Sequence, residues 1–362
     1  MKITNEILYA QDMDMSGTGL TYGKAGVDIS YTDALKREMA AYLHPQNPRV
    51  LNGLGPFASL YDIRFDHIEN PVLVLKSEEP GSKQKLAMQY GYTESICHDL
   101  INHLVNDIIV MGAKPLAVLD TIICGNAEKD TIKALVKGIA EACRENECDL
   151  VGGETSIQPG VVEKGIYILS ASIAGIVDRE NIIDGSAIHA GDKLLALASN
   201  GLHTNGYSFV RLLMDTVPQI RDGTIGGETF LEAVMKPHMP YYRAVKGLFG
   251  NPAIHGMAHI TGGGIEGNLS RIIPAGLTAR VDLGKIVAPP IFSYIQSMGG
   301  IADHEMLSAF NCGAGLIIAV QASAEAPVTK ALSGYCPCYT IGEIEQGSAP
   351  VIFENRITWP NK

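Results

Sequence analysis

Short runs rich in β-branched residues alternate with longer helical patterns along most of the chain, and this alternation restricts the possible folds more than any other feature. Strand patterns occupy residues 70–77 ("NPVLVLKS"), 115–123 ("PLAVLDTII") and 167–178 ("YILSASIAGIVD"). Between these runs, residues 93–111 and 128–146 repeat apolar side chains at the spacing of an amphipathic helix. Strands that alternate with helices in this way predict a mixed α/β or α+β fold.

A chain of 362 residues is long for a single hydrophobic core and sufficient for two domains. The polar, glycine-containing stretch at 179–192 ("RENIIDGSAIHAGD") is the predicted boundary, which gives an N-terminal domain of residues 1–178 and a C-terminal domain of residues 179–362. Beyond it, the pattern over 193–214 predicts a strand, a turn and a helix. Strand-like runs broken by glycine follow in "IHGMAHITGGG" and "CGAGLIIAVQA", so the second domain is also expected to be α/β.

The charge of the chain argues against two classes of partner. A net charge of −11 and a pI near 5.4 disfavour nucleic acid and an anionic membrane as main partners, although a local nest of amides and a metal can still bind a nucleotide. No run of about 18 apolar residues is present, so we expect no membrane span. The opening "MKITNEILYAQDMDMSG" lacks the features of a secretion signal, and seven cysteines without a CxxC pair indicate reduced thiols. We therefore expect a cytoplasmic protein.

The helix predicted over residues 95–111 has an unusual polar face. A helical wheel places Leu100, Ile101, Leu104, Val105 and Ile108 on one side and His98, Asp99, Asn102, His103, Asn106 and Asp107 on the other. Solvated faces favour Lys, Glu, Arg and Gln, because Asp, Asn and His each cost a few tenths of a kcal/mol more in a helix. Their short side chains hold oxygen and nitrogen close to the backbone, which suits a hard cation or a polar ligand. A merely solvated face is the alternative.

Two segments bring carboxylates to the ends of predicted strands. In "CDLVGGETS" (148–156), the strand is expected to stop at Gly152 and Gly153, with Glu154 directly beyond, where open α/β sheets bind ligands. The segment "KSEEPGSKQKLA" (76–87) has two carboxylates, a Pro-Gly turn and a lysine that begins a helix, whose free N–H groups suit a phosphate. It lacks the P-loop pattern. An ordinary glycine-rich turn and a charged surface turn are the respective alternatives.

Two polar turns precede predicted helices in the second domain. The segment "ASNGLHTNGYS" (198–208) places His203 in a turn, where it can act as a general acid or base or contact a phosphate, although turn chemistry alone also explains its Asn and Gly residues. The segment "HITGGGIEGNLSRIIP" (259–274) has three consecutive glycines between an apolar strand and a helix carrying Arg271, an arrangement that suits an anion nest. A flexible loop is the alternative.

Taken together, these segments resemble the aminoimidazole ribonucleotide synthetase family, also called phosphoribosylformylglycinamidine cyclo-ligases. The resemblance follows the family's order through "TYGKAGVDIS", "NGLGPFASLYDI", "VNDIIVMGAKPL", "LVGGETS", "ENIIDGS", "GDKLLALASNGLHTNGYS", "HITGGGIEGNLSRIIP" and "DHEMLSAFNCGAGLII". Such a series covers most of the chain, is specific to the broader superfamily, and points to this member of it.

The resemblance implies a two-domain α/β fold that dimerises through its N-terminal domains, whose strands form a barrel-like interface with an ATP cleft beside it. ATP and Mg²⁺ are the implied cofactors, a small ribonucleotide is the implied substrate, and a homodimer is the implied assembly. The polar face of the helix over 95–111 is then expected to point into the Mg–ATP cleft.

The resemblance also assigns roles to residues that match the family's motifs. Carboxylates suit Mg²⁺, a lysine supplies a point charge to phosphates, and glycine-rich turns offer backbone amides. Catalytic roles fall on Lys83, Asp107 and His203; ATP binding on Gly81, Ser82, Lys83, Asn106, Gly152 and Gly153; substrate binding on Thr204, Asn205, Gly262, Gly263 and Gly264; and metal binding on Glu78, Asp99 and Glu154.

The implied reaction is the ATP-dependent cyclisation of formylglycinamidine ribonucleotide to aminoimidazole ribonucleotide in purine biosynthesis. Phosphorylation turns the amide oxygen of the substrate into a good leaving group. A nitrogen of the same molecule then attacks, and phosphate leaves as the imidazole ring closes. Proximity promotes the cyclisation, whereas the phosphoryl transfer requires charge neutralisation and in-line positioning.

The chain departs from the family at the loop over 77–83, which is "SEEPGSK" where the family has "TDGVGTK". Glu78 is one methylene longer than the family's Asp, Glu79 adds negative charge beside a polyanion, and Pro80 removes an N–H group. In "PHMPYYRAV" (237–245), the family's basic residue is not obviously retained. Two alternatives therefore stay open: a divergent paralogue that uses ATP to activate another small substrate, and a non-catalytic regulatory homologue.

Overall fold

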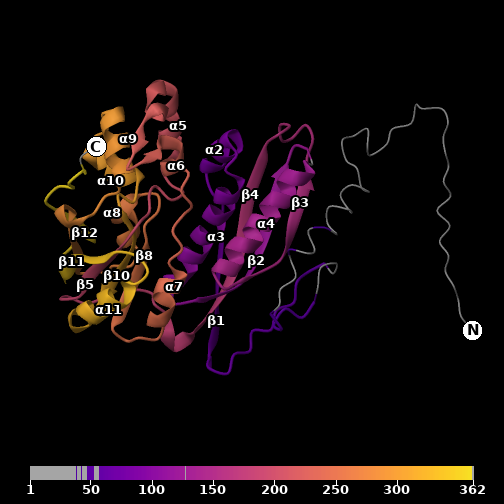
Figure 1. Cartoon of the computed structure of the whole chain (residues 1–362). Coiled ribbons are helices and arrows are strands. Elements are labelled where there is room, and N and C mark those ends of the chain that lie inside the picture. Colours follow the sequence, from indigo (N-terminus) through magenta and orange to yellow (C-terminus); the bar gives the residue numbers. More distant parts are fainter. Residues whose placement is uncertain (1–37, 39–41, 43–46, 53–56, 127, 361–362) are drawn as a thin grey trace, which may run out of the picture.

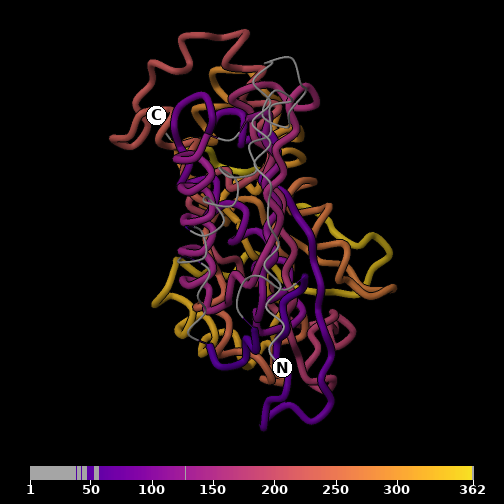
Figure 2. The backbone as a smooth tube through the Cα atoms, turned by 90° about the vertical axis from the view of Figure 1, so that its right-hand side faces the viewer, coloured from indigo at the N-terminus to yellow at the C-terminus, as the bar shows by residue number. Residues whose placement is uncertain are grey.

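The structure is a computed structural model that describes residues 38, 42, 47–52, 57–126 and 128–360. Figure 1 shows two α/β units side by side, the first coloured indigo to magenta and the second orange to yellow. Figure 2 views the molecule from the side of the first unit. The mixed α/β, two-domain fold expected from the sequence is confirmed. The motif "TYGKAGVDIS" lies outside the described residues.

The first domain is a four-stranded sheet with strand order β1-β4-β2-β3 and helices on one face (Figure 1). Strands β1 and β2 both pair antiparallel with β4, and β3 pairs parallel with β2. The elements are β1 (Pro71–Glu78), α2 (Lys83–Tyr90), α3 (Thr93–Ile109), β2 (Lys114–Cys124), α4 (Lys129–Glu145), β3 (Asp149–Ile157) and β4 (Tyr167–Asp178).

The second domain is built on a six-stranded sheet with strand order β12-β9-β11-β5-β10-β8, antiparallel except between β9 and β12. Its strands are β5 (Lys193–Ala198), β8 (Ile254–His259), β9 (Leu277–Asp282), β10 (Ala314–Val320), β11 (Cys338–Gln346) and β12 (Val351–Glu354), with a small hairpin of β6 (Thr224–Ile225) and β7 (Glu228–Thr229). Its helices are α5 (Tyr207–Thr216), α6 (Phe230–Val234), α7 (Tyr242–Val245), α8 (Gly264–Leu269), α9 (Pro290–Gly299), α10 (Asp303–Ala309) and α11 (Glu325–Leu332).

Strand β3 does not stop at its glycines, and this prediction was wrong. It continues through Gly152 and Gly153 to Ile157, paired with β2 along its whole length. A Cβ atom on Gly153 would lie only 1.9 Å from the Oδ1 atom of Asp120 on β2. The glycine therefore makes room for a carboxylate of the neighbouring strand, a close approach that other residues cannot offer.

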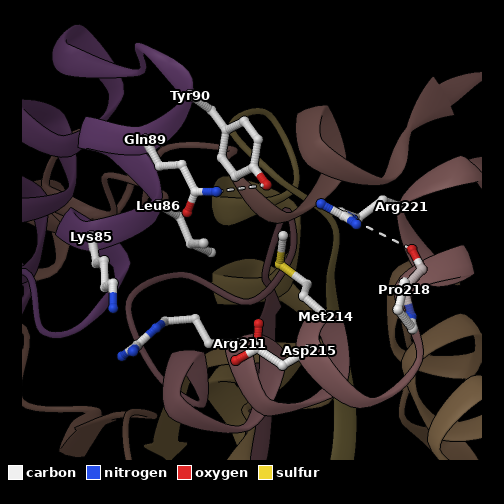
Figure 3. A pocket seen from close by; sticks show the side chains of 9 residues that line it. All are labelled: Lys85, Leu86, Gln89, Tyr90, Arg211, Met214, Asp215, Pro218 and Arg221. Carbon is white, nitrogen blue, oxygen red and sulfur yellow. Dashed lines mark hydrogen bonds between the residues drawn. The ribbon is translucent and has the colours of Figure 1, made fainter.

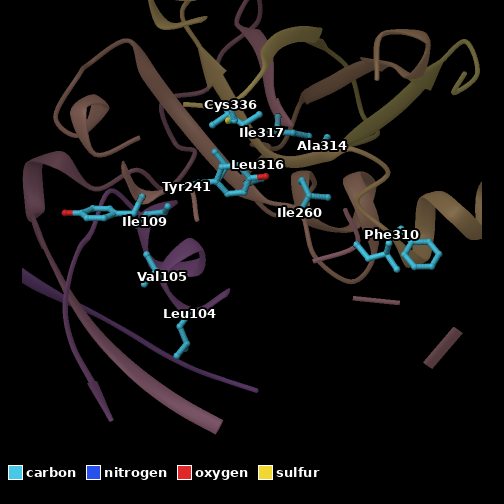
Figure 4. Close-up of a cluster of buried hydrophobic side chains, with 14 of the residues drawn as sticks. Leu104, Val105, Ile109, Tyr241, Ile260, Phe310, Ala314, Leu316, Ile317 and Cys336 are labelled. Carbon is cyan, nitrogen blue, oxygen red and sulfur yellow. The ribbon is translucent and has the colours of Figure 1, made fainter. Parts of the chain in front are cut away.

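Helix α3 joins the apolar interiors of the two domains. Its side chains Leu104, Val105 and Ile109 belong to one buried apolar cluster together with Tyr241 and with Leu316 of β10 (Figure 4). Burying such side chains gives roughly 1.5–3 kcal/mol each relative to leaving them exposed. The apolar face of α3 is therefore buried in the core, as its periodicity predicts.

The polar face of α3 contacts a segment of the second domain without regular secondary structure, residues 235–241, which we call the seam segment. Asp99 accepts a hydrogen bond from the backbone N–H of His238 at 2.8 Å. Asn102 donates to the backbone carbonyl of the same residue at 2.7 Å. These side chains lie on one face of the helix because residues spaced by three or four positions align there.

One turn further along, Asn106 continues this contact. It accepts a hydrogen bond from the backbone N–H of Tyr241 at 3.0 Å and donates to the backbone carbonyl of Met239 at 2.8 Å. Asp99 and Asn106 are 0% exposed and Asn102 is 2% exposed. The solvated-face alternative is therefore wrong, because these short side chains satisfy backbone groups that would otherwise be buried without partners.

Replacing Asn106 with Leu tests this contact. The change keeps the number and branching of the side-chain heavy atoms but leaves the N–H of Tyr241 and the carbonyl of Met239 without partners, at about 1–3 kcal/mol for each buried group. We expect the free energy of unfolding, measured by urea denaturation, to fall by about 2–6 kcal/mol. The matched control is Asn70→Leu at an exposed position, where a change within about 0.5 kcal/mol is expected. Equal effects of the two substitutions would contradict the role given to Asn106.

Candidate active site

A buried ion pair links helix α2 to helix α3. The Nζ atom of Lys83 lies 2.8 Å from both carboxylate oxygens of Asp99, and neither side chain is exposed. The same ammonium group donates to the backbone carbonyls of His203 at 3.0 Å and Lys236 at 2.6 Å. Burial lowers the pKa of Lys83 and raises that of Asp99 to about 6, and the attraction between the two charges opposes both shifts.

This geometry uses all the hydrogen-bond donors of Lys83 within the protein. An ammonium group has three N–H donors, and here they face one carboxylate and two carbonyl oxygens. A phosphate could reach Lys83 only by replacing one of these acceptors. The assignments of Lys83 to catalysis and ATP, and of Asp99 to a metal, stay predictions.

A chain of polar contacts runs from α3 into the second domain. Asp107 lies 2.7 Å from the Nδ1 atom of His259, whose Nε2 atom lies 2.9 Å from the Nε2 atom of His238. The Nδ1 atom of His238 is 3.3 Å from the hydroxyl of Thr204, which is 3.1 Å from the Nδ1 atom of His103. These side chains come from α3, from the seam segment, from the turn after β5 and from the end of β8. Folding thus assembles an imidazole cluster that is dispersed along the sequence.

Charges around Asp107 keep it ionised. Burial alone would raise the pKa of this carboxyl group, but the hydrogen bond from His259 and the nearby Lys76 ammonium hold it well below its usual value. Lys76 lies 3.0 Å from Asp107 and 2.9 Å from Glu78, so it connects two of the predicted site residues. Lys76 was not predicted from the sequence as a site residue. Its position near the end of a strand, directly before the loop over 77–83, could have indicated it.

Three carboxylates lie at neighbouring register positions of the first sheet. Glu78 of β1 and Asp120 of β2 both pair with Ala171 of β4, so they face the same side of the sheet with β4 between them, whereas Glu154 of β3 pairs with Thr121 and faces the other side. Burial raises the pKa of Asp120 to about 7, and the charge of Glu154 adds to this shift. Among the described residues, no Lys, Arg or His side chain forms an ion pair with Asp120 or Glu154. Asp120 was not predicted as a site residue; a carboxylate inside the apolar run "PLAVLDTII" was the signal.

The predicted phosphate loop and the predicted substrate turns lie side by side. A Cβ atom on Gly81 would lie 3.5 Å from the backbone oxygen of Thr204, and the hydroxyl of Ser82 is 3.4 Å from that of Ser208. A Cβ atom on Gly262 would lie 3.3 Å from the Oδ1 atom of Asn205. The structure therefore brings together segments 81–83, 203–205 and the start of the triple glycine.

The triple glycine differs from its prediction in detail. Gly263 and Gly264 donate their backbone N–H groups to the carbonyls of Ser308 and Thr261, both at 3.1 Å. Helix α8 ends at Leu269, so Arg271 lies beyond it and the prediction that the helix carries this residue was wrong. The substrate-binding roles of Gly262, Gly263 and Gly264 stay predictions, as do the ATP-binding roles of Gly152, Gly153 and Asn106.

A separate cavity of about 310 Å³ lies between α2 and α5 (Figure 3). Lys85, Arg211 and Arg221 line it together with Asp215. None of the residues assigned to the site from the sequence lines this cavity. The predicted site and this cavity are therefore different places on the molecule.

Comparison with known proteins identifies both domains. Residues 70–177 match the N-terminal domain of the AIR synthase related proteins, and residues 189–354 match their C-terminal domain. A phosphoribosylformylglycinamidine cyclo-ligase of Methylobacillus flagellatus is 41% identical over 322 residues, covering 89% of this chain and 93% of that protein. Another, from Paraburkholderia phymatum, is 40% identical over 309 residues, covering 85% of this chain and 87% of that protein.

Solved structures share the fold at low sequence identity. A thiamine-monophosphate kinase from Stenotrophomonas maltophilia has a TM-score of 0.63 and 19% identity, covering 90% of this chain and 97% of that one. The hydrogenase maturation protein HypE, solved in complex with ATP, has a TM-score of 0.63 and 17% identity, covering 91% of this chain and 92% of that one. At these identities the likeness concerns the fold.

The buried ion pair makes a stability prediction. Replacing Lys83 with Met strands the Asp99 carboxylate in the interior, and we expect the free energy of unfolding to fall by about 3–5 kcal/mol in urea denaturation. Adding Asp99→Asn removes the stranded charge but keeps an oxygen for the N–H of His238, so the double variant should recover part of the loss. A double variant less stable than Lys83→Met alone would contradict this account. Glu141→Ala, which removes an exposed ion pair with Lys137, is the control, with a change below about 1 kcal/mol.

Proposed function

The chain belongs to the AIR synthase related protein family, and on that premise we propose that it is an ATP-dependent phosphoribosylformylglycinamidine cyclo-ligase. The proposed substrate is formylglycinamidine ribonucleotide, and the proposed product is aminoimidazole ribonucleotide. Identities of about 40% over most of the chain to curated cyclo-ligases support this assignment over the other members of the fold group.

The observation that carries the proposal is the meeting of three segments from two domains. Segments 81–83 and 203–205 lie side by side, and Gly262 lies beside Asn205, while Glu78 stands at the end of the strand that leads into the loop. A reaction between a nucleotide and a second phosphate-bearing molecule requires both to be held in one place. A junction between domains is a common location for such a site.

The carboxylates fit a hard divalent cation. Burial, and then the charge of Glu154, raises the pKa of Asp120, and among the described residues neither carboxylate forms an ion pair with Lys, Arg or His. Glu78 and Asp120, which face the same side of the first sheet, would hold Mg²⁺, which prefers carboxylate oxygens. When bound, Mg²⁺ neutralises charge on the transferring phosphoryl group.

The groups of this chain supply positioning. In the proposed reaction the substrate's amide oxygen bonds to the terminal phosphorus of ATP and ADP leaves; a nitrogen of the same molecule then bonds to the activated carbon, and phosphate leaves with the former amide oxygen. The attacking nitrogen loses a proton as the ring closes, and the leaving phosphate takes it up. Burial, and then the neighbouring imidazoles, lower the pKa of His203, so its ring is neutral and only a weak base. Asp107 orients the ring of His259 through a hydrogen bond of 2.7 Å.

We also propose a homodimer formed through the first sheet. Helices cover one face of this sheet, and the other face bears Leu73, Leu75, Leu119 and Ile168, which are 50%, 71%, 48% and 41% exposed. In β1 the exposed and half-buried positions alternate, as expected for a strand with one free face. An exposed apolar patch of this kind is typical of a protein–protein interface.

A reducing compartment suits the cysteines. All seven are free and buried, without a disulfide. No helix of the described residues is long and apolar enough to span a membrane. Since disulfides are rare in the cytosol, we propose that the enzyme works in the cytoplasm.

The activity has a direct test. Purified protein should release ADP and phosphate only when ATP, Mg²⁺ and formylglycinamidine ribonucleotide are all present. Asp120→Asn and Glu78→Gln should each lower kcat by roughly 10²–10³-fold, because each removes charge stabilisation from the phosphoryl transfer. Glu141→Gln, on the outer surface of α4, is the matched control and should retain the wild-type rate.

Two outcomes would favour the alternatives left open by the altered loop. A paralogue with another substrate would be indicated by two results. ATP turnover would not depend on formylglycinamidine ribonucleotide, and the protein would not rescue a purine auxotroph that lacks the cyclo-ligase. The absence of nucleotide binding in calorimetry would indicate a regulatory homologue. Wild-type rates in both carboxylate variants would remove the proposed metal ligands.

The dimer has its own test. Leu75→Asp places a charge in the middle of the exposed apolar face, so it should shift sedimentation equilibrium from dimer to monomer. The matched control is Val287→Asp, a substitution at a 64% exposed position of the second domain, which should leave the protein dimeric. A wild-type protein that sediments as a monomer at micromolar concentration would contradict the proposal.

A further inference from the structure

Three buried imidazoles converge where the two domains meet. One ring nitrogen from each of His203, His238 and His259 lies within 4.8 Å of the others. The rings of His203 and His238 are stacked, with centroids 4.0 Å apart. These residues come from the turn after β5, the seam segment and the end of β8, so the fold brings them together from three separate segments.

The ring of His203 is buried without a hydrogen bond to another described residue. The residue is 1% exposed, yet neither ring nitrogen has a partner in the part of the chain that the structure describes. Leaving a buried polar group unsatisfied costs about 1–3 kcal/mol. The residue also has a φ of +62°, which is uncommon for a residue other than glycine. Gly315 provides space for its ring, since a Cβ atom there would lie 2.8 Å from the Cε1 atom of His203. A ligand for His203 accounts for these costs.

The other two imidazoles are already oriented toward a shared point. His259 contacts Asp107 through Nδ1 at 2.7 Å, and His238 contacts the hydroxyl of Thr204 through Nδ1 at 3.3 Å. Both rings therefore present Nε2 inward, where the two atoms share a hydrogen bond of 2.9 Å, and one proton must leave before both nitrogens can bind an ion. A histidine that binds a metal typically donates its outer N–H group to a carboxylate or another oxygen, which fixes the ring and exposes the inner lone pair.

We propose that His203, His238 and His259 bind one divalent ion of the Zn²⁺ class, with Asp107 and Thr204 orienting two of the rings. Imidazole nitrogen suits Zn²⁺, Co²⁺ and Ni²⁺, whereas Mg²⁺ prefers oxygen, so this site is chemically distinct from the carboxylates of the first sheet. The inference does not depend on the cyclo-ligase activity. Since Asp107 belongs to α3 and the ligands to the second domain, a bound ion also strengthens the contact between the domains.

Co²⁺ tests the site, because its visible spectrum reports both the ligands and their geometry. Chelator-treated, full-length protein should bind one Co²⁺ per chain, with the intense visible bands of a four- or five-coordinate nitrogen site, and Zn²⁺ should abolish these bands by displacement. His203→Gln and His238→Gln should each weaken binding at least 10-fold, and Asp107→Asn by about 10–100-fold through the orientation of His259. The melting temperature should rise on adding Zn²⁺ to the wild type but not to His203→Gln.

Controls separate this site from the other histidine groups. His189→Gln alters a second group, formed with Asp192 and His255, and should leave Co²⁺ binding unchanged. His103 forms an overlapping group with Asp107 and His259, so binding that requires His103 but not His203 would overturn the assignment. His203→Gln is the decisive variant if His238→Gln fails to fold, because His203 has no side-chain hydrogen bond to lose. A wild-type protein without a Co²⁺ spectrum would overturn the proposal outright.

Discussion

The structure depends on how helix α3 satisfies the backbone of the seam segment. This segment crosses the contact between the domains without regular secondary structure, so its buried N–H and carbonyl groups have no strand beside them. Asp99, Asn102 and Asn106 take the place of a neighbouring strand and provide those partners. Buried backbone groups need such partners in nearly every native protein. The arrangement fixes the register of the seam segment and, with it, the position of His238.

The buried charge of Asp99 then explains the position of Lys83. A carboxylate that serves backbone groups in the interior requires a countercharge, and the lysine at the start of α2 supplies it. Because the same ammonium group also holds the carbonyl of His203, the turn after β5 is tied to the loop over 77–83. The ion pair between Lys83 and Asp99 therefore positions the loop over 77–83, the seam segment and the imidazole cluster relative to one another.

Most of the regular elements could be predicted from the sequence, because their periodicity is local. The helical pattern over 128–146 corresponds to α4, whose buried positions include Ile132, Leu135, Val136 and Ile139, and the strand pattern over 167–178 corresponds to β4. The errors concern long-range contacts. The continuation of β3 through Gly153 depends on Asp120 of another strand. The burial of the polar face of α3 depends on residues more than 130 positions away, at the seam segment. A single sequence contains no direct signal for such pairs.

The altered loop fits this framework without disturbing its buried parts. Pro80 is buried, and Gly81 has a left-handed φ of +63° against the backbone of Thr204, so packing determines the shape of the loop up to Lys83. Glu79, which carries the extra charge, is exposed, where water and salt reduce its repulsion of a bound anion. Glu78 contacts Lys76, which also neutralises Asp107. Among Glu78, Glu79 and Pro80, only Glu79 is exposed to solvent, whereas Pro80 packs in the interior and Glu78 contacts Lys76. The loop therefore keeps its connection to α3 through Lys83 and Asp99 despite the change in its sequence.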